Sequence, residues 1–190
     1  MRADARRNYE HLLAVARQAI EEQGAEASLR DIARKADVGL GTLYRHFPTR
    51  EALLEALLRT TLDDLTKMAG ELEVSKSPDD ALLSFFREGV AFVRSYSGIV
   101  DTMAAAIADE NSALHTSCTT LRTAGARLLR NAQRAGRARA DIDGADLFAL
   151  MGALGWLGDQ ASFAPRAEHL ADLIASAILT NPPGGRYKAG

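Results

Sequence analysis

The chain has 190 residues, of which 47% are apolar, 25% charged and 6% aromatic, and its formal net charge is −2. This length and composition describe a globular protein with a substantial buried core and exclude a disordered chain. The single cysteine, Cys118, excludes an internal disulfide, and no Cys/His spacing fits a structural zinc site, so a reducing cytoplasm is the expected compartment. The charged N-terminus predicts no signal peptide, and the longest apolar run, 147–158, is shorter than the roughly 20 residues that cross a bilayer.

Apolar residues recur at helical spacing along nearly the whole chain, and alternating β-branched and aromatic runs are absent, which predicts an all-α fold. A first helix is expected to end near Gly24, and Ser28 is expected to cap a second helix that stops at the Asp37-Val38-Gly39 turn. A short third helix follows, and Thr49 is expected to cap a longer fourth helix that connects two halves of the chain.

These elements predict two domains, a helix-turn-helix unit at 1–48 and a helical domain at 49–190. Within the second domain we expect the connecting helix at 49–70, a polar loop at 71–80 and a flexible tail at 181–190. The remaining helices are predicted at 79–96, 99–109, 112–136, 145–160 and 166–180.

The third predicted helix, at about 40–47, has two different faces. At about 100° per residue, Leu43 and Phe47 share one face with Leu40 at its edge, while Gly41 and Arg45 point the opposite way. A helix that enters the DNA major groove needs a spot without a side chain for close approach and an arginine that can pair with guanine. Groups that can bond phosphate lie beside this outward pair: Thr42, Tyr44 and His46.

Positive charge is concentrated in the same region, although the chain as a whole is slightly acidic. Between residues 28 and 50, two acidic residues, Asp31 and Asp37, face a larger basic set: Arg30, Arg34, Lys35, Arg45 and Arg50. A local excess of positive charge on a small compact unit is typical of a surface that meets phosphate.

This region resembles the N-terminal domain of the TetR (TetR/AcrR-like) family of transcriptional regulators over about residues 8–58. The resemblance lies in Leu29-Arg30-Asp31-Ile32-Ala33, Ala36-Asp37-Val38-Gly39 and Gly41-Thr42-Leu43-Tyr44-Arg45-His46-Phe47-Pro48-Thr49-Arg50-Glu51-Ala52-Leu53-Leu54. Beyond residue 60 it is architectural only. It implies phosphate contacts by Thr42, Tyr44, His46 and Arg50, and base reading or close approach at Arg30, Leu40, Gly41 and Arg45.

The predicted helix 79–96 is apolar over more than one stripe, which is typical of core and also of a helix that lines a ligand chamber. The resemblance implies a small, largely apolar effector in this half of the chain. The candidate ligand-binding residues are Phe85, Phe86, Phe92, Tyr96, Met103, His115, Cys118, Trp156 and Asp159. Core packing is the alternative role for each of them.

The helix predicted at 145–160 is rich in small residues, and the one at 166–180 has a single apolar face. Small residues let helix backbones approach closely, and the resemblance implies that both helices pair with their symmetry mates in a homodimer. The alternative is that they only close the core of one subunit.

Together these features and the resemblance predict a ligand-responsive, homodimeric DNA-binding regulator. The resemblance implies a repressor that a small effector releases from a palindromic double-stranded DNA operator. We expect no enzyme activity, catalytic residue, metal or cofactor. His115 and Cys118 stand three apart and leave open a nucleophile with a base, or two metal ligands without an evident third. Two other functions also remain open: a small-molecule enzyme or carrier that uses the C-terminal cavity, and a protein-interaction module.

Overall fold

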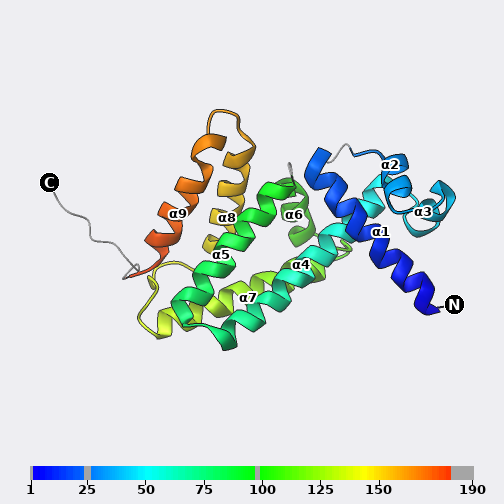
Figure 1. The fold of residues 1–190 in the computed structure, drawn as a ribbon. Helices are drawn as coiled ribbons and strands as arrows, with labels where there is room; N and C mark the ends of the chain where they lie inside the picture. Colours follow the sequence, from blue (N-terminus) through cyan, green and yellow to red (C-terminus); the bar gives the residue numbers. More distant parts are fainter. Residues whose placement is uncertain (1, 24–26, 97–98, 181–190) are drawn as a thin grey trace.

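The structure, a computed structural model, describes residues 2–23, 27–96 and 99–180, and in these ranges it is helical apart from short connections and one isolated bridge between Ala138 and Leu179. This confirms the predicted all-α fold (Figure 1). The elements are α1 (Arg2–Gln23), α2 (Leu29–Lys35), α3 (Leu40–His46), α4 (Arg50–Ser75), α5 (Pro78–Ser95), α6 (Ile99–Ala108), α7 (His115–Arg134), α8 (Gly144–Asp159), the 3-10 turn η1 (Ala164–Arg166) and α9 (Ala167–Ile178).

Helices α1 to α3 and the start of α4 form a small unit at one end of the molecule, and α8 and α9 lie at the other end (Figure 1). Two predicted caps are confirmed: Ser28 Oγ accepts the amide of Asp31 at 3.4 Å, and Thr49 Oγ1 accepts that of Ala52 at 3.1 Å. Each cap satisfies an amide that the helix itself leaves without a partner. The predicted end of the first helix near Gly24 and the tail at 181–190 lie outside the described residues.

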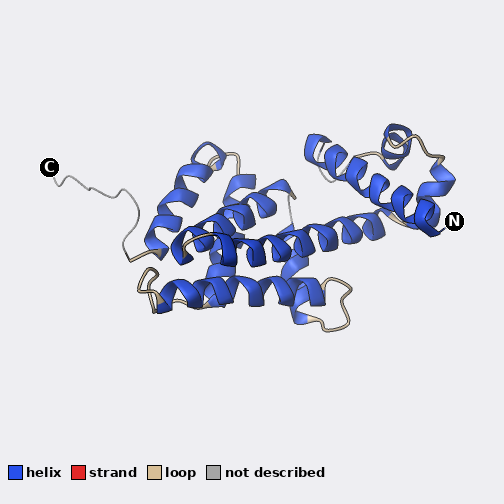
Figure 2. Ribbon diagram, turned by 60° about the horizontal axis from the view of Figure 1, so that its bottom comes forward, coloured by secondary structure: helices blue, strands red, loops and turns tan. Residues whose placement is uncertain are grey.

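Helix α4 runs from the N-terminal unit along α7 and into the C-terminal bundle (Figure 2). It continues to Ser75, so the predicted loop at 71–80 is wrong, and only Lys76 and Ser77 separate it from α5. The reason is tertiary: Leu72 is buried, and the Glu73 carboxylate accepts hydrogen bonds from Arg127 Nε and Asn131 Nδ2 on α7, each at 2.8 Å. The polar residues of this last turn have partners on another helix, which their local composition does not reveal.

Helix α5 is the centre of the C-terminal bundle and packs against α4, α7, α8 and α9. Two glycines allow neighbouring helices to approach α5 closely in this core. A Cβ atom on Gly155 of α8 would lie 2.1 Å from Val93 on α5, and one on Gly125 of α7 would lie 2.6 Å from the ring of Phe85. Because no side chain fits at either position, these glycines set how closely α7 and α8 approach α5.

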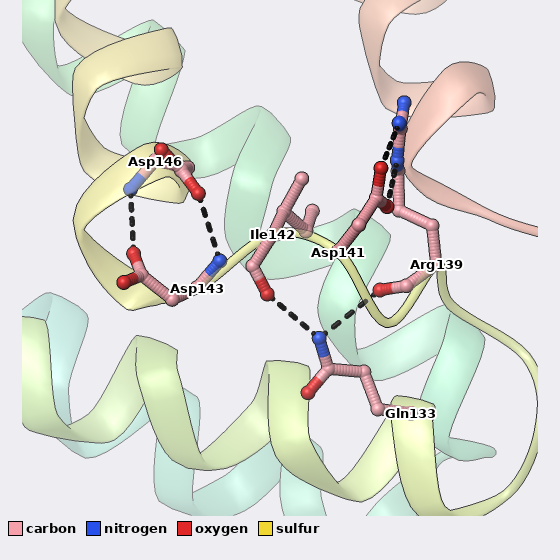
Figure 3. Close-up of polar contacts among 6 residues, drawn as sticks. All are labelled: Gln133, Arg139, Asp141, Ile142, Asp143 and Asp146. Atoms are coloured by element: carbon pink, nitrogen blue, oxygen red, sulfur yellow. Dashed lines mark hydrogen bonds and ion pairs between the residues drawn. The ribbon is translucent and has the colours of Figure 1, made fainter.

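The connection between α7 and α8 is held by polar contacts (Figure 3). Gln133 Nε2 donates to the carbonyl oxygens of Arg139 and Ile142, at 3.0 and 2.9 Å. Asp143 and Asp146 form a reciprocal capping box at the start of α8. Arg139 binds both carboxylate oxygens of Asp141, and this hydrogen bonding lowers the pKa of Asp141 to about 2. The first turn of α8 is thereby fixed beside α7.

The described part of the chain contains no helix long and apolar enough to span a membrane.

Candidate DNA-binding and ligand-binding sites

Helix α3 is only two turns long, and tertiary contacts hold it in place. Leu43 is fully buried, and Phe47, at the C-terminal end of α3, is 2% exposed. The ring of Tyr9 on α1 lies 5.1 Å from the ring of Phe47 and 5.9 Å from that of His46. The side of α3 that the sequence predicted to be buried is therefore the side that packs on α1.

The turn that precedes α3 contains an unusual backbone conformation. Asp37 adopts φ 53°, in the left-handed region that Asp and Asn enter more readily than other non-glycine residues. Val38 N then donates to the carbonyl of Ala33 at 3.0 Å and closes the end of α2. Gly39 has an ordinary extended conformation, so the reversal of the chain depends on Asp37.

The opposite side of α3 is open to solvent. A Cβ atom on Gly41 would meet nothing within 4 Å, and Tyr44 is 45% exposed. Arg45 is exposed and forms no hydrogen bond or ion pair with any residue that the structure describes. The outer side of α3 therefore presents a backbone position without a side chain and an available guanidinium. Both features suit direct contact with base edges.

The other residues predicted to contact DNA surround this face. Arg30 is exposed on α2, Thr42 and His46 are half-buried on α3, and Leu40 is half-buried against the core. Arg50, in the first turn of α4, donates from Nη2 to the carbonyl of Ala27 at 2.8 Å. It therefore ties α4 to the segment before α2 and contributes positive charge beside α3.

Ion pairs separate the basic residues of this unit into two groups. Arg34 pairs with Asp31 and Lys35 with Glu22, each at 2.8 Å. Arg30 and Arg45 have no ion pair within the described ranges. The two arginines that the sequence assigned to base reading are therefore available for an external anion or acceptor.

The C-terminal bundle contains a partly open cavity of about 290 Å³ between α4, α5, α6, α7 and α8. This volume is at the lower end of the range for small-molecule sites. The lining residues, nearly all apolar, are Leu65, Phe85, Gly89, Phe92, Val93, Met103, Ala104, Ile107, Leu121, Arg122, Ala145, Phe148, Ala149, Met151, Gly152 and Ala153.

Three of the predicted ligand-binding residues, Phe85, Phe92 and Met103, line this cavity. The structure places the others elsewhere: Phe86, Tyr96 and Cys118 are buried outside the lining, His115 is half-buried, and Trp156 and Asp159 are exposed.

His115 and Cys118 have surroundings that favour structural roles. His115 Nδ1 lies 3.0 Å from the carbonyl oxygen of Ala106 on α6. Burial raises the pKa of the Cys118 thiol, although the charge of Arg122 opposes the shift, and a thiol of raised pKa is a poor nucleophile. No cluster of three or more metal-ligating side chains occurs among the residues described.

The α8 side of the cavity was not predicted. Phe148, Met151 and Gly152 line it, whereas the residues of helix 145–160 predicted to bind the ligand were Trp156 and Asp159, and the helix was otherwise predicted to form the dimer contact. The available signal was an apolar character on all sides of this helix, which is typical of an element buried on more than one face.

Apolar residues also remain uncovered on α8 and α9. Trp156 on α8 is 53% exposed, and Leu173 on α9 is 51% exposed. Ala145, Ala149 and Ala153 are exposed on the same side of α8 as Trp156, since they recur at helical spacing. Exposed apolar surface of this kind typically marks a contact site.

The fold and the α3 site together define a helix-turn-helix DNA-binding transcriptional regulator. Residues 12–57 match the family of bacterial regulatory proteins described as the tetR family, and residues 77–178 match the C-terminal domain described as transcriptional regulator SbtR-like. The chain belongs to the TetR family of transcriptional regulators. Members of this family are generally DNA-binding proteins without enzyme activity.

Solved structures agree over nearly the whole length. The TetR transcriptional regulator SCO0520 from Streptomyces coelicolor is 32% identical, with a TM-score of 0.70 over 90% of this chain and 98% of that one. A TetR regulatory protein from Mycobacterium vanbaalenii is 30% identical, with a TM-score of 0.67 over 94% of this chain and 98% of that one. An HTH-type transcriptional regulator of Staphylococcus aureus (strain USA300) is 36% identical over 64 residues, a match that spans 33% of this chain and 35% of the relative.

Proposed function

We propose that this protein is a homodimeric repressor that binds a palindromic operator and is released from it by a small, largely apolar effector. Residues 1–48 form the DNA-binding domain, and residues from 49 onward form the effector-binding and dimerisation domain. The observation that carries the proposal is the two-faced α3, with Leu43 buried beneath it and Gly41 and Arg45 open on its outer side.

The proposed DNA contacts follow from that geometry. Arg45 reads a base pair, with close approach at Gly41, and Arg30 and Leu40 lie beside the bases. Thr42, Tyr44, His46 and Arg50 contact phosphates, which sets the position of α3 in the groove. Two copies of α3 then meet successive major grooves, about 34 Å apart.

Dimerisation through α8 and α9 supplies the second copy. The partly exposed side chains of Trp156 and Leu173 support this interface, because a partner subunit would cover apolar surface that one subunit leaves in water. A twofold interface uses the same surface of both subunits. The row of Ala145, Ala149 and Ala153 on α8 would therefore face the same row of the partner subunit, and these small side chains would allow the two helices to approach closely.

A series of contacts connects the cavity with the DNA-binding domain. Met103 and Ile107 on α6 line the cavity, and the carbonyl of Ala106, between them, lies 3.0 Å from Nδ1 of His115 at the start of α7. Two residues further along α7, Ser117 Oγ donates to Asp63 on α4 at 2.8 Å.

The next residue on α4 makes the connection to the DNA-binding domain, since Asp64 pairs with Arg17 of α1 at 3.4 Å. We propose that an effector which binds one arrangement of α6 and α7 more tightly than another shifts α4 and changes the spacing of the two α3 helices. The factor by which operator affinity falls then cannot exceed the ratio of the effector affinities of the two states.

Selection of bound fragments from random duplex DNA tests the proposal. A palindromic consensus is expected, and Arg45→Ala should lose the preference for it, whereas Arg134→Ala, which removes an exposed charge from α7, should keep it. Absence of any enrichment at low salt, where attraction to phosphate is strongest, would refute specific DNA binding. Turnover or tight capture of a small molecule without DNA preference would favour the enzyme or carrier instead.

A further inference from the structure

The lining of the C-terminal cavity contains a single charged side chain among the residues described, that of Arg122 on α7. Every other lining residue is aliphatic, aromatic, methionine or glycine. A cavity of this composition selects for an apolar ligand body, and one well-placed polar group then determines orientation and specificity.

Arg122 is not neutralised by the protein. Its guanidinium forms no hydrogen bond or ion pair with a residue in the described ranges. Arg127, on the same helix, pairs with Glu73 at 2.8 Å. Arg122 is half-buried beside apolar walls, where a charge without a partner is costly and an incoming anion is favoured.

The position of Arg122 is also distinctive, because it lies where two spaces meet. An open groove with polar lining residues shares Arg122 and Ala145 with the cavity. Thr119, Thr123 and Arg130 contribute hydroxyls and a second positive charge to that groove. Its acidic residue, Asp143, is occupied as the N-cap of α8, where its carboxylate accepts the amides of the first turn. A guanidinium at such a boundary is placed for the head of a molecule whose body is in the cavity.

We propose that the effector is a small anionic amphiphile: an apolar body fills the cavity, and a terminal carboxylate pairs with Arg122 at the border of the polar groove. The inference rests on the proposed effector function and specifies the ligand class. Arginine suits this role because its planar guanidinium donates two parallel hydrogen bonds to a carboxylate and keeps its charge at all physiological pH values.

A matched ligand series tests the proposal. Octanoate, octan-1-ol and octylamine share an alkyl chain and differ in the charge of the head group, and calorimetric titration of the full-length protein gives the affinity for each. We expect octanoate to bind about tenfold more tightly than octan-1-ol, because one charge-assisted hydrogen-bonded pair accounts for a difference in affinity of this size. Octylamine should bind most weakly.

Variants then assign the preference to Arg122. Arg122→Gln should bind octanoate and octan-1-ol equally, and Arg122→Lys should keep part of the preference because it keeps the charge. Arg134→Gln removes an exposed charge from the same helix and should behave as the wild type. Circular dichroism of Arg122→Gln, together with its retained affinity for octan-1-ol, shows that a lost preference is not a loss of fold.

Three outcomes would overturn the inference. The wild type could bind octanoate and octan-1-ol with equal affinity, Arg122→Gln could keep the preference for octanoate, or the wild type could bind none of the three probes. With equal binding, the apolar effector site itself would stand. Operator selection on the same preparation reports on the regulator function separately, so failure of the anion proposal and failure of the proposed function give different results.

Discussion

The substitution Gly41→Ala should change folding stability and operator affinity in opposite directions. In the free protein a Cβ atom at this position meets nothing within 4 Å, so a methyl group fits without displacing a neighbour. Glycine in a helix is about 1 kcal/mol less favourable than alanine. Gly41 lies in the first turn of α3, where part of that difference applies, so we expect a gain in stability of up to about 1 kcal/mol.

On DNA the same methyl group enters the space between α3 and the base edges. The close approach that Gly41 permits is lost, and Arg45 on the same face is held further from its base. A good base contact is worth about 1 to 3 kcal/mol, so we expect operator affinity to decrease by about fivefold to about 150-fold. Affinity for random duplex DNA, which depends on phosphate contacts, should change much less.

Gly70→Ala is the matched control. Gly70 lies inside α4, well away from α3, and its added Cβ atom also meets nothing within 4 Å. It should raise stability by about 1 kcal/mol and leave operator affinity unchanged. Urea denaturation gives the stabilities, and fluorescence anisotropy with the selected operator gives the affinities. Unchanged operator affinity in Gly41→Ala, with a stability gain like that of Gly70→Ala, would refute the assignment of this face to DNA.

The remaining predictions concern base reading, dimerisation and acid stability. Arg45→Ala should reduce the free energy of operator binding by about 1 to 3 kcal/mol and relax the sequence preference at one base pair. Arg50→Ala should weaken binding to all duplexes alike and reduce the salt dependence of binding by about one ion. Titrations with operator and random DNA measure both effects. Trp156→Asp should yield a helical monomer by analytical ultracentrifugation, and a persistent dimer would contradict the α8 interface. The bond with Arg139 lowers the pKa of Asp141 to about 2, so the ionised carboxylate stabilises the folded state at pH values above its pKa in the unfolded chain. This stabilisation is lost as the pH falls from about 4 to 2. Asp141→Asn should therefore reduce the pH dependence of the unfolding midpoint in that window.

The helix-turn-helix unit could be predicted from the sequence because its determinants are local. Ser28 and Thr49 mark helix starts through side chains that cap the next amides, and α3 shows its buried face within a single turn. The left-handed backbone at Asp37 was not predicted. Glycine is the usual residue for that conformation, and a glycine stands two positions later, so local preference gave no reason to choose the aspartate.

Elements that depend on distant partners were harder to predict. The last turn of α4 has the composition of a loop, and it is helical because Glu73 binds residues that lie 54 and 58 positions later in the chain. Likewise, Phe85 and Phe86 are adjacent and both fully buried, yet only Phe85 reaches the cavity. A helix with apolar residues on several faces does not reveal which face meets another helix and which meets an empty space.

Arg122 shows how position on a helix determines the role of a charged residue. Arg127, Arg130 and Arg134 follow at spacings of three and four and form a basic stripe along α7. Arg122 precedes Arg127 by five residues, which at about 100° per residue turns it about 140° away from Arg127. That rotation separates Arg122, at the cavity wall, from Arg127, which pairs with Glu73 on α4, while Arg130 lies between them and shares the open groove with Arg122. The helical repeat shows that Arg122 differs from the stripe, but the space it faces is defined only when α5, α6 and α8 are assembled around it.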